Sequence, residues 1–225
     1  AKNKEIARIE QKQDAQKALL DLLHSDLKAA LDKTDEHYLV QGFSQEQMDS
    51  LSERKNKAVS IDDNDKVKAA IATVKESFEK VQTAYNRQEA VNSLYQKDDQ
   101  SQAMDGIELK KDLAITDDLK KEIVTNVKDA YFVKDAKSDY DKTINTFITA
   151  AEDQVNQIET AKVAVSEIYN STEEKVSSVD QELYDKAKTE TEKIKNDKAR
   201  NELLDKVSQV KEEMDKQAEA KKEQE

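Results

Sequence analysis

The chain offers few side chains that could catalyse a reaction or bind a metal. His24 and His37 are its only histidines, and it has no cysteine. The two histidines do not form the His-x-x-x-His or His-Glu-x-x-His spacing that places two zinc ligands on one helix face. Catalytic zinc uses three protein ligands in one cluster. We therefore predict no metal site and no histidine base, and we expect His24 to end the first helix, where an imidazolium suits the helix dipole.

Two acidic runs resemble calcium loops at first sight. They are Asp62–Asp65 and Lys97–Asp99. An EF-hand needs oxygen ligands at positions 1, 3 and 5 and a glycine at position 6. Placing Gly106 at position 6 puts Ala103 at position 3, which fails, and the first run contains no glycine. We interpret the first run as a helix cap. The chain also lacks a glycine-rich phosphate loop and a nucleophile elbow, so we predict no cofactor and no enzymatic activity.

An apolar cluster around Gly42 is the best candidate for a binding surface. It consists of Tyr38, Leu39, Val40 and Phe43. Exposed apolar patches mark partner-binding sites, so one interpretation is a partner-binding patch. The other is that this loop folds back and closes the end of its own helical bundle.

Composition limits the classes of partner. The chain has 37 basic and 49 acidic residues, a net charge of −12 and 38% charged residues. This charge repels phosphate backbones, so we exclude nucleic acid and disfavour anionic membranes and anionic wall polymers. No apolar stretch approaches the roughly 18 residues of a membrane span. We expect a monomer that does not itself enter a membrane and that binds a protein, a peptide or a neutral glycan.

The spacing of apolar residues predicts an all-α fold. Two glycines and no proline leave little turn chemistry for a β-rich fold. Apolar residues instead recur at alternating intervals of four and three, which is one stripe of an α-helix. The stripes are Val67, Ile71, Val74, Phe78 and Val81; Tyr140, Ile144, Phe147 and Ala151; and Leu203, Val207, Val210 and Met214.

A short pattern of Ala, Leu or Val, two variable residues, Leu or Ile, and Leu or Tyr occurs three times. A branched aliphatic residue stands nine positions before each alanine, at Ile9, Val81 and Val155. Such self-similarity indicates a repeat architecture. The three copies are Ala18-Leu19-x-x-Leu22-Leu23, Ala90-Val91-x-x-Leu94-Tyr95 and Ala164-Val165-x-x-Ile168-Tyr169.

Each copy is followed by a loop and a predicted short second helix. In the first copy Ser44 and Gln47 form a capping box, and Phe43 can pack on Met48. In the second copy we predict a helix start at Thr116, with Asp117 and Asp118 in the first turn. In the third copy Asp180 is the predicted cap.

A further helix closes each copy. The predicted caps of these closing helices are Asp62 or Asp63, then Asp135 or Ser138, then Asn196 or Asp197.

We predict that the closing helix of one copy runs into the opening motif of the next. Residues 62–95 and 135–169 contain neither glycine nor proline. The predicted fold is therefore tandem, spectrin-like three-helix bundles joined by two shared helices of about 34 residues into a rod of roughly 80–120 Å. The modules would span residues 1–80, 81–152 and 153–225. The alternative is a kink near Asn86-Arg87 or Gln157-Ile158.

The step Ala90-Val91-Asn92-Ser93-Leu94-Tyr95, followed by a polar loop and a capped second helix, resembles helical extracellular modules of Gram-positive bacterial cell-surface proteins. This resemblance implies an ectodomain that lies outside a membrane anchor and holds or senses cell-wall material. The expected function is thus a non-enzymatic extracellular rod that acts as a spacer or binds the wall or a protein. The alternative is a cytoplasmic scaffold or coiled-coil adaptor whose partners dock on helix faces.

Overall fold

A computed structural model describes residues 1–60 and 65–224 of the chain. The protein is mostly helical, with 68% of the described residues in helices. The described residues contain seven α-helices and two sheets of two strands each. The chain forms two compact units. Unit 1 comprises residues 1–92 and 101–110, and unit 2 comprises residues 93–100 and 111–225.

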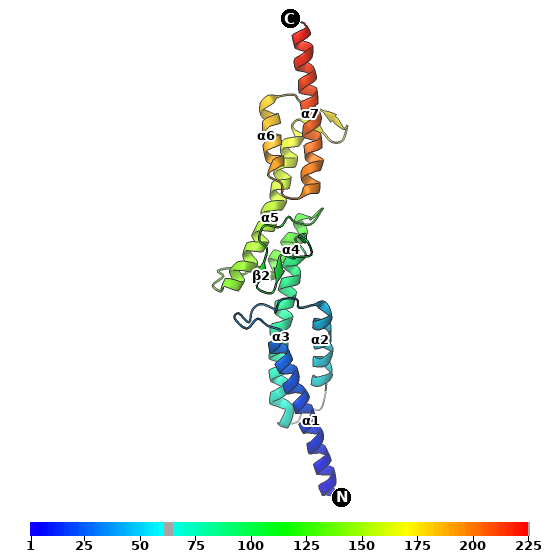
Figure 1. The fold of residues 1–225 in the computed structure, drawn as a ribbon, viewed down its shortest axis with the longest axis vertical. Helices are drawn as coiled ribbons and strands as arrows, with labels where there is room; N and C mark the ends of the chain where they lie inside the picture. The colour runs from blue at the N-terminus through cyan, green and yellow to red at the C-terminus, as the bar shows by residue number, and fades with distance from the viewer. Residues whose placement is uncertain (61–64, 225) are drawn as a thin grey trace. The chain divides into compact units, whose positions relative to one another are not determined.

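Unit 1 is built on three helices that pack pairwise (Figure 1). They are α1 (Lys2–Ala29), α2 (Gln45–Val59) and α3 (Asp65–Asn92). A hairpin of β1 (Met104–Asp105) and β2 (Glu108–Leu109) completes the unit and contacts α3.

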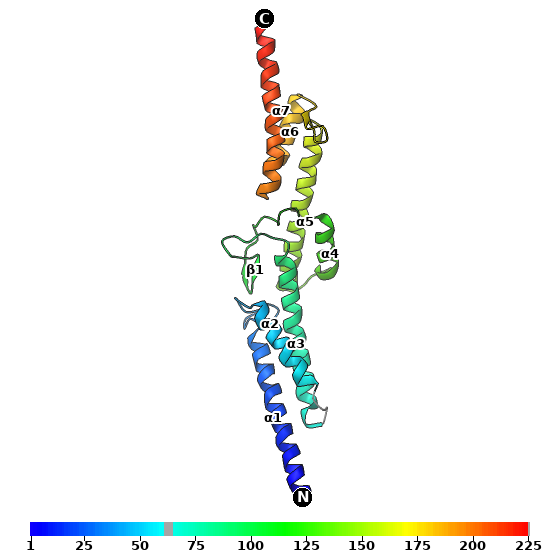
Figure 2. The same ribbon diagram turned by 90° about the vertical axis from the view of Figure 1, so that its right-hand side faces the viewer.

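Unit 2 is organised around one long helix, α5 (Asp139–Ser166). This helix packs against α4 (Lys121–Tyr131), which lies beside its first half in Figure 2. It also packs against α6 (Gln181–Glu192) and α7 (Asp197–Glu223). The strands β3 (Tyr169–Asn170) and β4 (Lys175–Val176) form a short hairpin that contacts α7.

The two long interior helices are continuous at the positions where the sequence also allowed a kink. α3 continues through Asn86 and Arg87, and α5 continues through Gln157 and Ile158. Each has 28 residues, against the 34 or so predicted. Each helix ends earlier than predicted because the residues after its last turn leave the helix and form β-type pairs.

The predicted apolar stripes form the cores. Ile71, Val74, Ile144 and Phe147 are all buried. Phe78 is only half-buried, because it lies at the edge of the unit 1 core, where the Lys55 ammonium sits 5.0 Å from its ring centroid. Periodicity therefore located the core faces of α3, α5 and α7.

Most of the predicted caps are confirmed. Ser44 and Gln47 form the capping box of α2. Ser138, Asp180 and Asn196 each accept a hydrogen bond from a backbone N–H in the first turn of α5, α6 and α7. Asp135 is not a cap and has a positive φ of 56°. Asp62 and Asp63 lie outside the described residues.

The predicted start of α4 is wrong. The helix begins at Lys121, and its N-cap is Lys120 rather than Thr116. Asp118 has a left-handed φ of 58°, which a helix cannot contain. The carboxylates of Asp117 and Asp118 instead accept hydrogen bonds from side chains at the start of α7.

The sequence pattern aligned the first copy of the repeat with the other two in the wrong register. Three helix ends share one arrangement, in which a residue just after the helix pairs in β fashion with the returning loop. The pairs are Leu31 with Leu39, Tyr95 with Ile115, and Tyr169 with Val176. Leu31, rather than Leu23, is thus the counterpart of Tyr95 and Tyr169.

The mismatch has a clear physical cause. Leu19 and Leu22, which the motif aligns with the buried Val91 and Leu94, are 62% and 55% exposed, and Ile9 is 48% exposed. The pattern matched leucines on the solvent-facing side of α1. The division into three modules at residues 80 and 152 stays a prediction.

Candidate functional site

The apolar cluster around Gly42, predicted as a partner-binding patch, lies mostly in the core of unit 1. Tyr38, Leu39 and Phe43 are buried, and Val40 is partly buried against the same core. The Phe43 ring meets Tyr85 of α3 edge to face, with centroids 6.1 Å apart. These side chains therefore form no exposed patch, in agreement with the alternative that the loop closes its own bundle.

A close backbone contact holds this loop under the β1–β2 hairpin. Gly106, in the two-residue turn of the hairpin, has φ +60°, and a Cβ there would lie 2.7 Å from the carbonyl oxygen of Leu39. The Asp105 carboxylate accepts a hydrogen bond of 2.7 Å from the backbone N–H of Gly42. The Gln88 side chain accepts one of 3.1 Å from the N–H of Gly106. The loop thus has a structural role.

The histidines make local polar contacts. His24 lies inside α1 rather than at its end, which corrects the prediction, and its Nδ1 is 3.0 Å from the Ser77 hydroxyl. His37 Nδ1 is 2.7 Å from an Asp35 carboxylate oxygen. Within the described residues, no group of three His, Cys, Asp or Glu side chains is placed to hold a metal ion.

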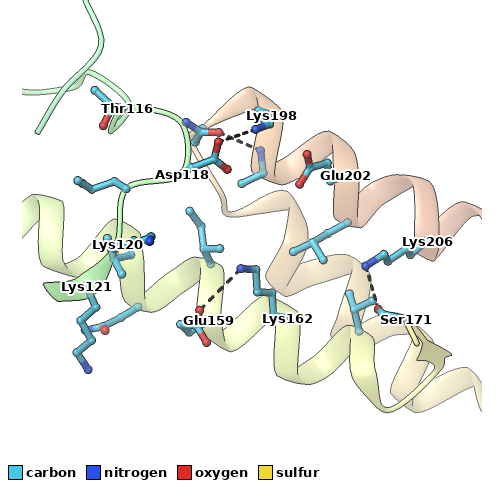
Figure 3. Close-up of a pocket in the computed structure, with 18 residues that line it drawn as sticks. Thr116, Asp118, Lys120, Lys121, Glu159, Lys162, Ser171, Lys198, Glu202 and Lys206 are labelled. Atoms are coloured by element: carbon cyan, nitrogen blue, oxygen red, sulfur yellow. Dashed lines mark hydrogen bonds and ion pairs between the residues drawn. The ribbon is translucent and has the colours of Figure 1, made fainter. Parts of the chain in front are cut away.

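Unit 2 contains a groove lined by charged side chains. It has a volume of about 850 Å³ and lies between α5, α7 and the segment that leads into α4 (Figure 3). Ligand sites usually occupy roughly 300–1,000 Å³. Its charged lining residues are Lys120, Lys121, Lys162, Lys198, Lys206, Asp118, Glu159 and Glu202.

Five lysines and three carboxylates give this groove an excess of positive charge in a chain whose net charge is −12. Lys198 Nζ lies 2.6 Å from Asp118, and Lys162 Nζ lies 3.9 Å from Glu159. The hydrogen bond to Asp118, together with its negative charge, raises the pKa of Lys198. This lysine is therefore cationic at neutral pH and already paired.

Three lysines and one carboxylate, Glu202, remain outside these two ion pairs. Lys206 Nζ donates to the Ser171 hydroxyl at 2.9 Å and lies 5.8 Å from the centroid of the Tyr169 ring. Lys120 and Lys121 stand at the start of α4 and form no ion pair with a described residue. The groove therefore keeps free positive charge that can attract an anion.

The lining contains neither histidine nor cysteine. Its chemistry is that of electrostatic binding. Sequence reasoning missed this site because net charge averages over the whole chain, while the lysines of the groove come from α4, α5 and α7. The adjacent pair Lys120-Lys121 was visible in the sequence but was placed inside a predicted helix.

No described helix is both long enough and apolar enough to cross a membrane. No protein-family model matches the chain, and neither a curated protein nor a solved structure matches it.

Proposed function

We propose that this chain is a non-enzymatic structural rod that acts as a spacer and interaction segment. The observation that carries the proposal is the use of one helix by two packing groups. α5 packs against α4 and also contributes Ala161, Ala164 and Val165 to a core with α6 and α7. An uninterrupted helix keeps two such groups at a fixed separation, because it contains no hinge.

The dimensions of the shared helix suit a spacer. A helix of 28 residues spans about 42 Å at a rise of about 1.5 Å per residue. Its two packing groups bury a thin apolar stripe, and the other faces carry charged residues. Such faces resist folding of one group back on another, so we expect an extended chain.

Small-angle scattering tests this proposal directly. A compact protein of 225 residues would have a radius of gyration of about 17 Å, whereas the proposed rod should give at least about 25 Å. A radius of gyration below about 20 Å would contradict the spacer proposal and favour a compact binding domain.

A matched pair of variants makes the test specific to α5. Thr160 is exposed and lies inside the helix. Thr160→Pro removes a helical hydrogen bond and clashes with the preceding turn, so it should alter the distance distribution. Thr160→Ala should leave the scattering profile unchanged. Equal profiles for both variants would show that the helix does not set the length.

We further propose that the rod lies outside the cell, as the resemblance to surface modules implies, with a cytoplasmic scaffold as the alternative. The lysine-rich chain suits an amine-reactive label that cannot cross membranes. Labelling in intact source cells would support the extracellular location. Labelling only after lysis would support the cytoplasmic scaffold.

A further inference from the structure

The start of α4 has the opposite charge from the one that helices favour. Its N-cap is Lys120 and its first residue is Lys121, and no side chain caps its free N–H groups. Helix N-termini carry partial positive charge and prefer Asp, Ser, Thr or Asn. Two ammonium groups at this end repel the helix dipole, and Glu122 is the acidic residue in the first turn of α4.

The two acids in the segment before α4 form contacts with α7. Asp117 accepts a hydrogen bond of 2.9 Å from the Asn196 amide, and Asp118 pairs with Lys198. Both contacts hold the segment before α4 against the start of α7. The same fold therefore brings α7's first turn to the groove and draws the carboxylates of Asp117 and Asp118 toward α7.

Several positive features thus converge on one cavity. The starts of α4 and α7 line it, together with Lys162 from α5 and Lys206 from further along α7 (Figure 3). Helix N-termini and lysines together are a recurrent arrangement for binding phosphate groups.

We propose that this groove binds phosphate groups, as a short linear chain of phosphates rather than as a single ion. Its volume of about 850 Å³ is larger than one phosphate needs. The lysines outside its ion pairs outnumber the remaining carboxylate, Glu202, and they lie on both sides of the groove, with Lys120 and Lys121 on one side and Lys206 on the other (Figure 3). The overall charge of −12 argued against anionic ligands. The groove reverses that conclusion locally, since short-range attraction operates within about a Debye length of 10 Å at 0.1 M salt. This proposal is independent of the spacer proposal.

Titration calorimetry with sodium tripolyphosphate at low ionic strength tests the groove, with inorganic phosphate as the single-ion arm. The test variant is Lys120→Gln combined with Lys121→Gln. The matched control is Lys68→Gln combined with Lys75→Gln, which removes the same charge from exposed positions on α3. Circular dichroism verifies that both variants remain folded.

We expect tripolyphosphate to bind at least about tenfold more tightly than inorganic phosphate, since several lysines act together. The groove variant should lose about tenfold or more in affinity, and the control less than about twofold. Tripolyphosphate should also raise the melting temperature of the parent more than that of the groove variant.

Three outcomes would overturn the proposal. The first is no detectable binding to the parent at low salt. The second is an equal loss of affinity in the groove variant and the control, which would mean a diffuse charge effect. The third is tighter binding of a single-stranded oligonucleotide of equal charge that the groove substitutions do not weaken, which would indicate a nucleic-acid surface elsewhere.

Discussion

The first half of α1 and the first half of α5 share two apolar positions that differ in what covers them. Counted back from the bridged residues Leu31 and Tyr169, Ile6 and Ile9 hold the positions of Ile144 and Phe147. Ile6 and Ile9 are 53% and 48% exposed, whereas Ile144 and Phe147 are each 1% exposed.

The difference arises from neighbouring elements in unit 2. Tyr95 meets Phe147 edge to face, with ring centroids 5.8 Å apart, and its hydroxyl donates to the Phe147 carbonyl. α4 packs on the same helix, and Lys128 joins it to Glu152 with a salt bridge of 3.2 Å. In α1, by contrast, the buried residues begin only at Leu20. Helical spacing therefore creates a face that can be buried, and the fold decides whether it is.

The substitution with the largest expected effect compares the buried face of α5 with the exposed face of α1. Phe147→Ala should lower the free energy of unfolding by about 3–5 kcal/mol, because it leaves a cavity in a packed core. Ile9→Ala, the matched control, should change it by less than about 0.5 kcal/mol, since exposed side chains bury little surface. Urea denaturation followed by circular dichroism measures both. Similar losses for the two variants would show that α1's first half is covered after all.

A substitution with a smaller expected effect tests how closely the β1–β2 hairpin packs on the loop around Gly42 in unit 1. Gly106→Ala should cost on the order of 2–3 kcal/mol, because the new Cβ would collide with backbone atoms of the loop at Leu39 and Gln41. Gly42 is a matched control, since its φ is +78° but nothing lies within 4 Å of an added Cβ. Gly42→Ala should cost only the left-handed strain of about 1–2 kcal/mol. Thermal melts that rank the two variants equally would mean that the close approach is not important.

The smallest effect sharpens the role of Tyr95 in covering α5. Burial raises the pKa of its hydroxyl above the usual value, so the folded state favours the neutral form. That contribution is fully present below the unfolded pKa of about 10 and is lost as pH rises toward the folded pKa. Tyr95→Phe should cost about 1 kcal/mol at neutral pH for the lost hydrogen bond.

The pH dependence provides the check on this prediction. The difference in stability between the parent and Tyr95→Phe should shrink as the pH rises above about 10. Denaturation curves at neutral and alkaline pH measure it. A difference that stays constant over this range would contradict a buried, neutral tyrosine.

The sequence determined the helices, their apolar faces and most of their ends. Periodicity located the stripe of α3, and local capping chemistry placed Ser44 and Asp180 correctly. It narrowed two further caps to pairs of candidates that include the observed Ser138 and Asn196. These features depend on residues within one or two helical turns of each other, so the local sequence contains the information. The same local logic failed at Thr116, because Asp117 and Asp118 form long-range contacts that compete with helix capping.

Only the tertiary structure decided which faces are covered and where charge gathers. Leu22 and Leu23 are adjacent in sequence, yet one is 55% exposed and the other 2% exposed. The lysines of the groove come from three helices and from the segment before α4, and no spacing rule relates Lys120 to Lys206. Burial and local potential depend on all the atoms within several ångströms, and most of those atoms belong to residues that are distant in sequence.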